Sequence, residues 1–295
     1  MKWVEAGAEL EKLLADDVPY GDLTTQALGI GDAPGEITFT ARDAMVAAEV
    51  ESAAALLELA GCRVTLATKS GTALAPGAKI LAASGPAAAL HRGWKVAQTL
   101  VEIWSGVASA ARAIVDAAAA ISPDVVVACT RKNVPGTKSY AIRAVRAGGA
   151  VMHRLGLSET VLVFPEHRIF LGEPLHDTVR RLRRSAPEKK LVIEVAKIDD
   201  GVAAATSGFD VIQAEKFTPA DIAALAERLA STRPRPLIAA AGGIDPDNAA
   251  AYAEAGAGIL VTSWPYLARP RDVQVRFVAV PSSDAGIQSL NAGTL

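Results

Sequence analysis

The feature that most constrains this 295-residue chain is a change of pattern near residue 120. Beyond it, short apolar runs alternate with amphipathic stretches, as in strands that pair in parallel through right-handed helical crossovers. Strands are predicted at 124–129, 149–152, 160–164, 191–195, 209–214, 236–240 and 258–262. Helices are predicted at 138–147, 173–185, 198–207, 218–230 and 246–255. Seven strands in about 145 residues favour a compact β/α barrel over an open sheet.

The first 120 residues follow a different order. Strand-like runs at 36–41, 62–68 and 78–84 are separated by turns and by an alanine- and leucine-rich helix at 47–60. This α+β pattern is preceded by a short predicted helix at 3–15. From 91 to 120, apolar residues recur every three or four positions, which predicts a long helix that joins two domains.

Composition and charge narrow the classes of function. The net charge of −2 gives no global basic field, so we expect no nucleic-acid partner. No apolar run approaches the roughly 18 residues of a membrane span, and the acidic N-terminus is unlike a signal peptide. Cys62 and Cys129 lie far apart in the sequence and follow no metal spacing. For two such cysteines a reduced compartment is the default expectation. We therefore expect a cytoplasmic protein with a local cluster of charges for small anionic molecules.

Polar residues gather where the predicted barrel strands end. Because the carboxyl ends of parallel strands meet at one edge, we expect these residues to form a ring. Each member alone could be a solvated surface pair or a plain turn, but their coincidence at six strand ends indicates a site. In chain order the ring comprises Thr130, Arg131, Lys132, His153, Arg154, Glu166, His167, Arg168, Glu194, Glu215, Lys216, Gly242, Gly243, Thr262 and Ser263.

This ring suits the recognition of a polyanion. Arginine binds carboxylate or phosphate in a bidentate manner, and lysine acts as a point charge. A Gly-Gly turn frees backbone N–H groups to hold a phosphate, and carboxylates in the same cavity can hold ribose hydroxyls or Mg²⁺. The residue types therefore indicate a phosphorylated sugar donor that meets an anionic acceptor.

Two blocks carry a specific resemblance. "TRKNVPGTK" (130–138) followed by "AGGAVMHRLGLSE" (147–159) resembles the quinolinate phosphoribosyltransferase (nicotinate-nucleotide pyrophosphorylase) family, and "GDLTT" (21–25), "WSGVAS" (104–109) and "AAAGGI" (239–244) support it. The resemblance implies an α/β fold of the type II phosphoribosyltransferases, with an N-terminal α/β sandwich and an incomplete C-terminal β/α barrel. The expected domains are 1–108 and 109–275, with a tail at 276–295 that packs on the first domain or is disordered.

The resemblance also implies an activity and a site. The family transfers phosphoribose from phosphoribosyl pyrophosphate, with Mg²⁺, to a pyridine nitrogen, and it works as a dimer. We therefore expect a homodimer or a higher homo-oligomer. By position, Lys132, Glu194 and Glu215 are expected to be catalytic, and Glu194 and Glu215 to hold Mg²⁺. The expected substrate-binding residues are Arg92, Arg131, Lys132, His153, Arg154, His167, Gly242 and Gly243. Of these, Arg92 is expected to complete the site of the neighbouring subunit, whereas His167 comes from the ring of strand-end residues alone.

The chain departs from the family pattern at several site positions. Phe164 replaces a lysine, Lys138 replaces an arginine, and Glu215-Lys216 replaces Asp-Asn. These departures resemble the ModD subgroup, the pyrophosphorylases encoded beside molybdenum-transport genes. We therefore expect a ModD-like phosphoribosyltransferase that acts on an acidic heteroaromatic acceptor. The alternatives are a quinolinate phosphoribosyltransferase (carboxylating) of NAD biosynthesis, and a non-catalytic binder of an anion such as molybdate.

Overall fold

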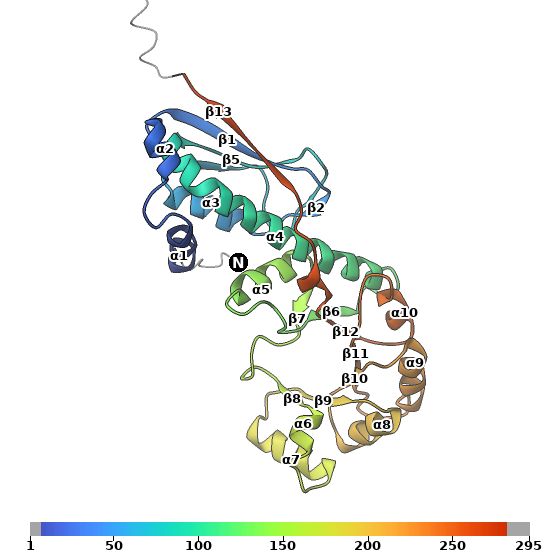
Figure 1. Cartoon of the computed structure of the whole chain (residues 1–295). Coiled ribbons are helices and arrows are strands. Elements are labelled where there is room, and N and C mark those ends of the chain that lie inside the picture. The colour runs from blue at the N-terminus through green and yellow to red at the C-terminus, as the bar shows by residue number, and fades with distance from the viewer. Residues whose placement is uncertain (1–6, 282–295) are drawn as a thin grey trace, which may run out of the picture. The chain divides into compact units, whose positions relative to one another are not determined.

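The computed structural model describes residues 7–281 (Figure 1), and the chain within it forms two compact units. The first unit is made of two segments, one that ends at Ala108 and one that starts at Arg269. The second unit spans Ser109–Ala268. Residues 269–275, which we assigned to the barrel domain, therefore group with the first unit. Of the expected tail, residues 282–295 lie outside the described residues. No helix between residues 7 and 281 is long and apolar enough to cross a membrane.

The first unit is built on an antiparallel sheet with the strand order β13-β1-β5-β3. Ile37, Phe39 and Leu81 are fully buried, and helix α3 packs on β3 and β5. The strands are β1 (Pro34–Ala41), β3 (Arg63–Leu66), β5 (Lys79–Pro86) and β13 (Val273–Ala279), with a separate short pair β2 (Met45–Val46) and β4 (Ala73–Leu74). The helices are α1 (Gly7–Asp17), α2 (Leu23–Leu28), α3 (Val50–Leu59) and α4 (Ala87–Ala119), which continues into the second unit.

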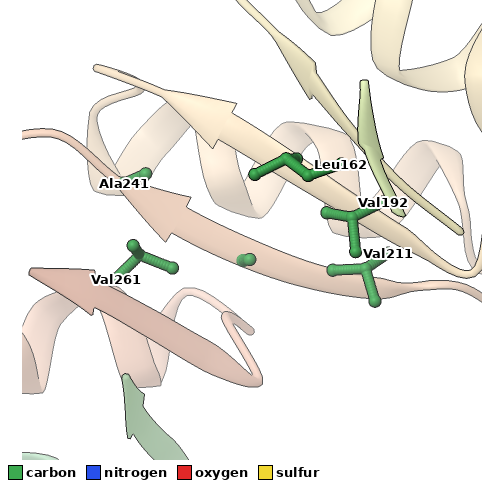
Figure 2. Packing of buried hydrophobic residues seen from close by; sticks show 6 residues of the cluster. Leu162, Val192, Val211, Ala241 and Val261 are labelled. Carbon is green, nitrogen blue, oxygen red and sulfur yellow. The ribbon is translucent and has the colours of Figure 1, made fainter. Parts of the chain in front are cut away.

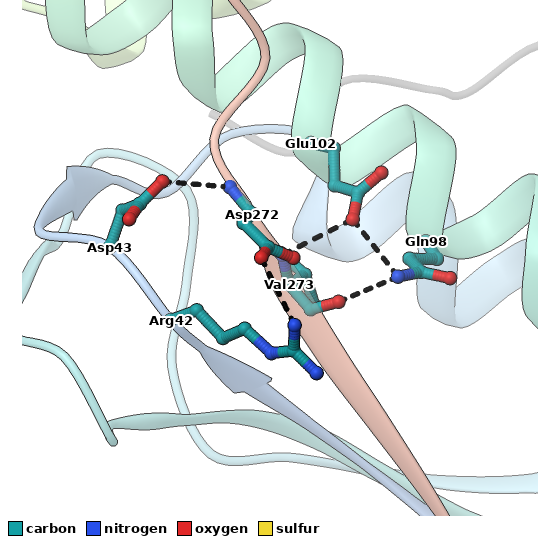
Figure 3. A network of polar contacts seen from close by, with 6 residues as sticks. All are labelled: Arg42, Asp43, Gln98, Glu102, Asp272 and Val273. Carbon is teal, nitrogen blue, oxygen red and sulfur yellow. Dashed lines mark hydrogen bonds and ion pairs between the residues drawn. The ribbon is translucent and has the colours of Figure 1, made fainter.

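Strand β13 is a seven-residue element that the sequence patterns do not predict. It pairs with β1 along its whole length, from Ala41 opposite Val273 to Gly35 opposite Ala279. Figure 3 shows how the segment is fixed to α4: the buried Gln98 amide donates to the Val273 carbonyl at 2.6 Å and to Glu102 Oε1 at 2.9 Å. Glu102 Oε1 also accepts the Val273 N–H at 3.1 Å. Residues 273–279 thus form an edge strand of the antiparallel sheet in the first unit.

The second unit is a seven-stranded parallel sheet with the order β7-β6-β12-β11-β10-β9-β8. Its strands are β6 (Val126–Cys129), β7 (Val151–Met152), β8 (Val161–Val163), β9 (Leu191–Val195), β10 (Val211–Glu215), β11 (Leu237–Ala241) and β12 (Ile259–Thr262). Its helices are α5 (Lys138–Ala147), α6 (Pro165–Arg168), α7 (Leu175–Ser185), α8 (Ile198–Ser207), α9 (Pro219–Arg228), α10 (Ala249–Glu254) and the 3₁₀ helix η1 (Trp264–Leu267). The strands β7 and β8 stand at the two edges of the sheet and do not pair with each other, so the expected incomplete barrel is confirmed.

The inward face of this sheet explains where its polar residues point. Leu162, Val192, Val211 and Val261 pack together with two alanines of β11 in the buried interior (Figure 2). Side chains alternate along a strand, so a residue two positions beyond an inward-facing valine also points inward. The residues that follow the inward-facing valines therefore form a polar layer above the apolar cluster, nearer the carboxyl ends of the strands.

Candidate active site

A cavity of about 720 Å³ opens at the carboxyl ends of the barrel strands. Its lining comes entirely from the second unit and includes eight of the predicted site residues: Arg131, Lys132, His153, Arg154, Glu194, Glu215, Gly242 and Gly243. It further includes Thr130, Leu162, Phe164, Glu166, Gln213, Ala241, Ile244, Val261, Thr262, Ser263, Trp264 and Leu267. The structure therefore brings residues from all seven strand ends to one hollow.

The Gly242-Gly243 turn after β11 requires glycine. Both residues have a positive φ, 92° and 81°, which L side chains rarely adopt. A Cβ on Gly242 would lie 3.0 Å from Glu215 Oε1 and 3.1 Å from the backbone nitrogen of Lys216, whereas one on Gly243 would meet nothing within 4 Å. The open space at Gly243 leaves room for a ligand to approach the backbone, as in sites that hold phosphate on main-chain N–H groups.

The neighbouring loop after β12 is held by its own hydrogen bonds. Thr262 Oγ1 donates to the Ile244 carbonyl at 2.6 Å and accepts the Trp264 N–H at 3.0 Å. The Thr130 N–H donates to the Thr262 carbonyl at 2.9 Å, and the Tyr266 hydroxyl donates to the Thr130 carbonyl at 2.8 Å. These contacts fix the turns that carry the glycines and the Arg131-Lys132 pair relative to each other.

Glu194 stands on the inward face two positions after Val192, and Gln213 lies directly opposite it on β10. The Gln213 amide donates to Glu194 Oε2 at 2.7 Å. Burial raises the pKa of Glu194, the charges of Glu215 and Glu166 raise it further, and the Gln213 hydrogen bond and Lys132 oppose the shift. Glu166, Glu194 and Glu215 all line the cavity, so it contains three carboxylates.

This group of carboxylates fits a magnesium ion. Mg²⁺ is commonly held by one or two protein carboxylates together with substrate phosphates and water. Within residues 7–281 no cluster of three or more His, Cys, Asp and Glu side chains has the geometry of a complete protein-made metal site. Glu194 and Glu215 are the residues that could hold such an ion, and its charge would offset the repulsion between them.

A contact between residues that follow the two edge strands, β7 and β8, bridges the open side of the barrel. The Arg154 guanidinium, which follows β7, stacks over the Phe164 ring, which follows β8, with the guanidinium carbon 5.4 Å from the ring centroid. Burial lowers the pKa of His153, the Arg154 charge lowers it further, and the Gln213 side chain acts in the opposite direction. His153 is thus biased toward its neutral form.

Two of the predicted substrate-binding residues, Arg92 and His167, do not line this cavity, and neither do Arg168 and Lys216 of the predicted ring. Arg92 belongs to the first unit, where its guanidinium is exposed and donates to the Leu59 carbonyl at 3.2 Å. His167 Nδ1 accepts the Phe164 N–H at 2.9 Å, and its ring stacks on that of Phe164 with the centroids 5.9 Å apart. The His167 contact is local, spanning three residues at the start of α6, and it supports the position of Phe164.

Gln213 is a site residue that we did not predict. It is only 4% exposed, although it is polar and lies inside a strand. The alternation that placed Glu194 on the inward face applies equally to Gln213, so the pattern contained the signal. The two cysteines carry no competing chemistry, because both thiols are buried and burial raises the pKa of Cys62 to about 11 and that of Cys129 to about 12.

Known proteins show the same two-part organisation. Residues 22–105 match the N-terminal domain of quinolinate phosphoribosyl transferase, and residues 107–276 match its C-terminal domain. A Rhodobacter capsulatus protein named "Putative pyrophosphorylase ModD" is 50% identical over 242 residues, which cover 82% of this chain and 93% of that protein. The human nicotinate-nucleotide pyrophosphorylase (carboxylating) is 31% identical over 246 residues, 83% of this chain and 82% of the human one.

The fold agrees with solved structures. The nicotinate-nucleotide pyrophosphorylase from Francisella tularensis superposes with a TM-score of 0.85 over 92% of this chain and 95% of that one, at 20% identity. At this identity the likeness speaks for the fold alone. The family models and the relatives above 30% identity go further, and they show that this chain belongs to the quinolinate phosphoribosyl transferase family.

Proposed function

We propose that the chain transfers phosphoribose from phosphoribosyl pyrophosphate to a ring nitrogen of an acidic heteroaromatic acceptor. Its family makes the chain a phosphoribosyltransferase, and its relatives include proteins named ModD. The observation that carries the proposal is a single cavity that combines a Gly-Gly turn, a carboxylate cluster and a cation-bearing open edge. These three regions suit the phosphate, the ribose with its metal, and the acidic acceptor, respectively.

The donor would bind along the middle of the sheet. The Gly242-Gly243 turn would hold a phosphate through backbone N–H groups. As pyrophosphate leaves, the ribose carbon develops positive charge and the leaving oxygens gain negative charge. Lys132 would stabilise the leaving oxygens, while Glu194 and Glu215 orient the ribose and hold Mg²⁺. When bound, Mg²⁺ supplies charge neutralisation at the pyrophosphate.

The acceptor would bind toward the open edge of the barrel. Arg131 and Arg154 would bind its acidic group and so fix the ring nitrogen in line with the ribose carbon. The nitrogen attacks with a free lone pair, so the step requires no general base. His153, biased toward its neutral form, suits a binding role through its ring N–H.

The decisive test of the transfer is pyrophosphate release. The purified protein is mixed with phosphoribosyl pyrophosphate, Mg²⁺ and each member of a panel of pyridine and other heteroaromatic acids. We expect acceptor-dependent release with at least one acid. Absence of release with every acid, together with tight binding of molybdate or another oxyanion, would favour a non-catalytic binder. Growth rescue of a strain that lacks quinolinate phosphoribosyltransferase would favour the carboxylating enzyme of NAD biosynthesis.

We also propose that the protein is a cytoplasmic homodimer in which Arg92 reaches the neighbouring subunit's site. Its support is the family resemblance and the exposure of Arg92 on α4. Arg92→Ala and Lys132→Ala should each be inactive as pure dimers, but subunit exchange at equal amounts should restore about a quarter of the wild-type rate, since half the dimers then hold one intact site. A mixture that stays inactive after verified exchange would contradict this arrangement.

A further inference from the structure

The Arg154 side chain is a buried cation without an anion. The residue is 8% exposed, and within the described part of the chain its guanidinium makes neither a hydrogen bond nor an ion pair. The guanidinium instead stacks on the face of Phe164. A buried guanidinium without a counter-charge is costly, and stacking on an aromatic face leaves its in-plane N–H donors free. The arrangement is therefore suited to an anionic ligand that lies in the plane of the guanidinium.

Arg131 lies close enough to affect Arg154. The charge of Arg131, after burial, lowers the pKa of Arg154, so the two cations repel each other in the free protein. Both also line the cavity. A single carboxylate placed between two guanidinium groups can accept from both and relieves their repulsion.

The wall beside Arg154 offers nothing to a second carboxylate. Phe164 is covered on its ring by Arg154 and by His167, and it packs on the apolar cluster that contains Leu162, Val192 and Val211. A carboxylate directed at this wall would lose water and gain no donor.

The charges of the residues that line the cavity also disfavour a second carboxylate on the acceptor. Three cations, Arg131, Lys132 and Arg154, stand against three carboxylates, Glu166, Glu194 and Glu215, and His153 is biased toward its neutral form. The lining is thus formally neutral before any substrate enters. Within this lining, the phosphates of the donor draw on Lys132, and one carboxylate of the acceptor takes Arg131 and Arg154. No cation of the same chain is then left for a second acidic group on the acceptor.

We propose that the acceptor is a flat heteroaromatic acid with a single carboxylate, and that Phe164 is the residue that excludes a second one. This inference rests on the proposed function, since it names the acceptor class of the same transfer. Phe164 acts in two ways: its face positions Arg154 for one carboxylate, and its apolar surroundings make the neighbouring position unfavourable for another.

Nicotinate and quinolinate are a matched pair of probes, because they differ by one carboxylate on the same pyridine ring. Binding of each to the full-length protein, with phosphoribosyl pyrophosphate absent, is measured by calorimetry, and kcat/KM is measured by pyrophosphate release. We expect wild type to bind nicotinate at least about 30-fold more tightly than quinolinate, which is the effect of one missing ion pair at a desolvated position.

Two substitutions at one position test the role of Phe164. Phe164→Lys adds a cation beside Arg154 and should shift the binding ratio toward quinolinate by roughly tenfold or more. Phe164→Leu keeps the wall apolar and should retain the preference for nicotinate. Circular dichroism and the thermal midpoint establish that both variants are folded, and the wild-type ratio decides the acceptor class even where a variant is not.

The outcomes separate this inference from the proposed function. Absence of pyrophosphate release with every acid of the panel, combined with tighter binding of nicotinate, would refute the transfer but keep the acceptor class. Tighter binding of quinolinate by wild type, or no binding of nicotinate at all, would overturn the acceptor class whether or not transfer occurs. An unchanged ratio of nicotinate to quinolinate binding in folded Phe164→Lys would show that Phe164 does not exclude the second carboxylate.

Discussion

Two buried glutamines, one in the first unit and one at the mouth of the barrel, differ in how completely their side chains are hydrogen-bonded. Around Gln98, each polar atom of the side chain is paired: the amide donates to Glu102 and Val273, and its oxygen accepts from Lys95 Nζ at 2.9 Å. Around Gln213, the amide nitrogen is paired, but the buried side-chain oxygen accepts no hydrogen bond within residues 7–281. Both glutamines are more than nine-tenths buried, so exposure does not explain the difference.

The difference separates structural polarity from functional polarity. A paired buried cluster stabilises the fold, because each group recovers the hydrogen bonds that it lost with water. An unpaired cluster lowers stability and persists where a ligand supplies the missing partners. Arg154 without an anion and Glu194 beside two like charges fit the second description. The pairing of Gln98 therefore stabilises the first unit, whereas the unpaired groups of the barrel mouth are suited to a ligand that supplies their partners.

The largest expected effect comes from removing a charge at the mouth. Lys132→Ala should lower kcat/KM for pyrophosphate release by roughly 100-fold or more, because the leaving oxygens lose a positioned positive charge. The thermal midpoint should change little, since Lys132 is exposed and forms no ion pair in the described part of the chain. Lys189→Ala, at an exposed position of the same unit, is the matched control. A loss of stability that matches the loss of rate would place Lys132 with the structural residues instead.

Arg154→Leu should separate binding from stability most clearly. We expect the Kd of an acidic acceptor to rise about 30-fold or more, because a buried charge partner is lost. The thermal midpoint should stay the same or rise, because the substitution removes an unpaired buried cation and keeps an apolar side chain against Phe164. Calorimetry and thermal unfolding on the same samples measure both. A clear drop in the midpoint would show that Arg154 stabilises the free protein.

The strands of the barrel could be predicted from the sequence because each one is marked by residues that are neighbours in the chain. The seven strands follow from apolar runs between helices, and the inward direction of Glu194 follows from the period of two within β9. The Gly242-Gly243 turn was predicted from its place after a strand, and its two positive φ angles agree with that prediction.

The failures share a different cause, which is contact between distant residues. β13 was missed because its partner β1 lies more than 200 residues away, as in the ion pair between Arg42 and Asp272. The stacking of Arg154 on Phe164 joins two strands that share no ladder, so no local pattern reports it. His167 appeared as a strand-end cation, but a hydrogen bond over three residues turns its ring nitrogen to the backbone.

A substitution at the paired Gln98 should lower stability and leave acceptor binding unchanged, which is the reverse of the effect expected at the barrel mouth. Gln98→Leu should lower the free energy of unfolding by about 1–3 kcal/mol, because the Val273 carbonyl and the Lys95 ammonium lose a partner. Acceptor binding should be unchanged, since Gln98 is not among the residues that line the cavity. Urea unfolding measures the effect, with Gln274→Leu at an exposed position of β13 as the control. Equal effects of the two substitutions would contradict a structural role for the pairing.

The smallest effect concerns the pH dependence of stability at Glu194. Its pKa in the folded protein is raised above the usual 4.5, so in the pH range just above 4.5 the folded state binds more protons than the unfolded state. Stability at this group is therefore fully present below pH 4.5 and declines as the pH rises through the folded pKa. Glu194→Gln keeps the shape and can still accept from the Gln213 amide, but it does not titrate.

We therefore expect the variant to gain stability relative to wild type as the pH rises from 4 to 7, and to show no gain at the acid end. Urea unfolding of both proteins at each pH measures the difference, which cancels the contributions of the other acidic groups. Mg²⁺ with phosphoribosyl pyrophosphate should stabilise wild type more than the variant at pH 7, because the ionised carboxylate then has its counter-charge. Parallel pH profiles of the two proteins would mean that Glu194 belongs with the satisfied polar groups of the first unit, and the contrast between the two clusters would then rest on Arg154 alone.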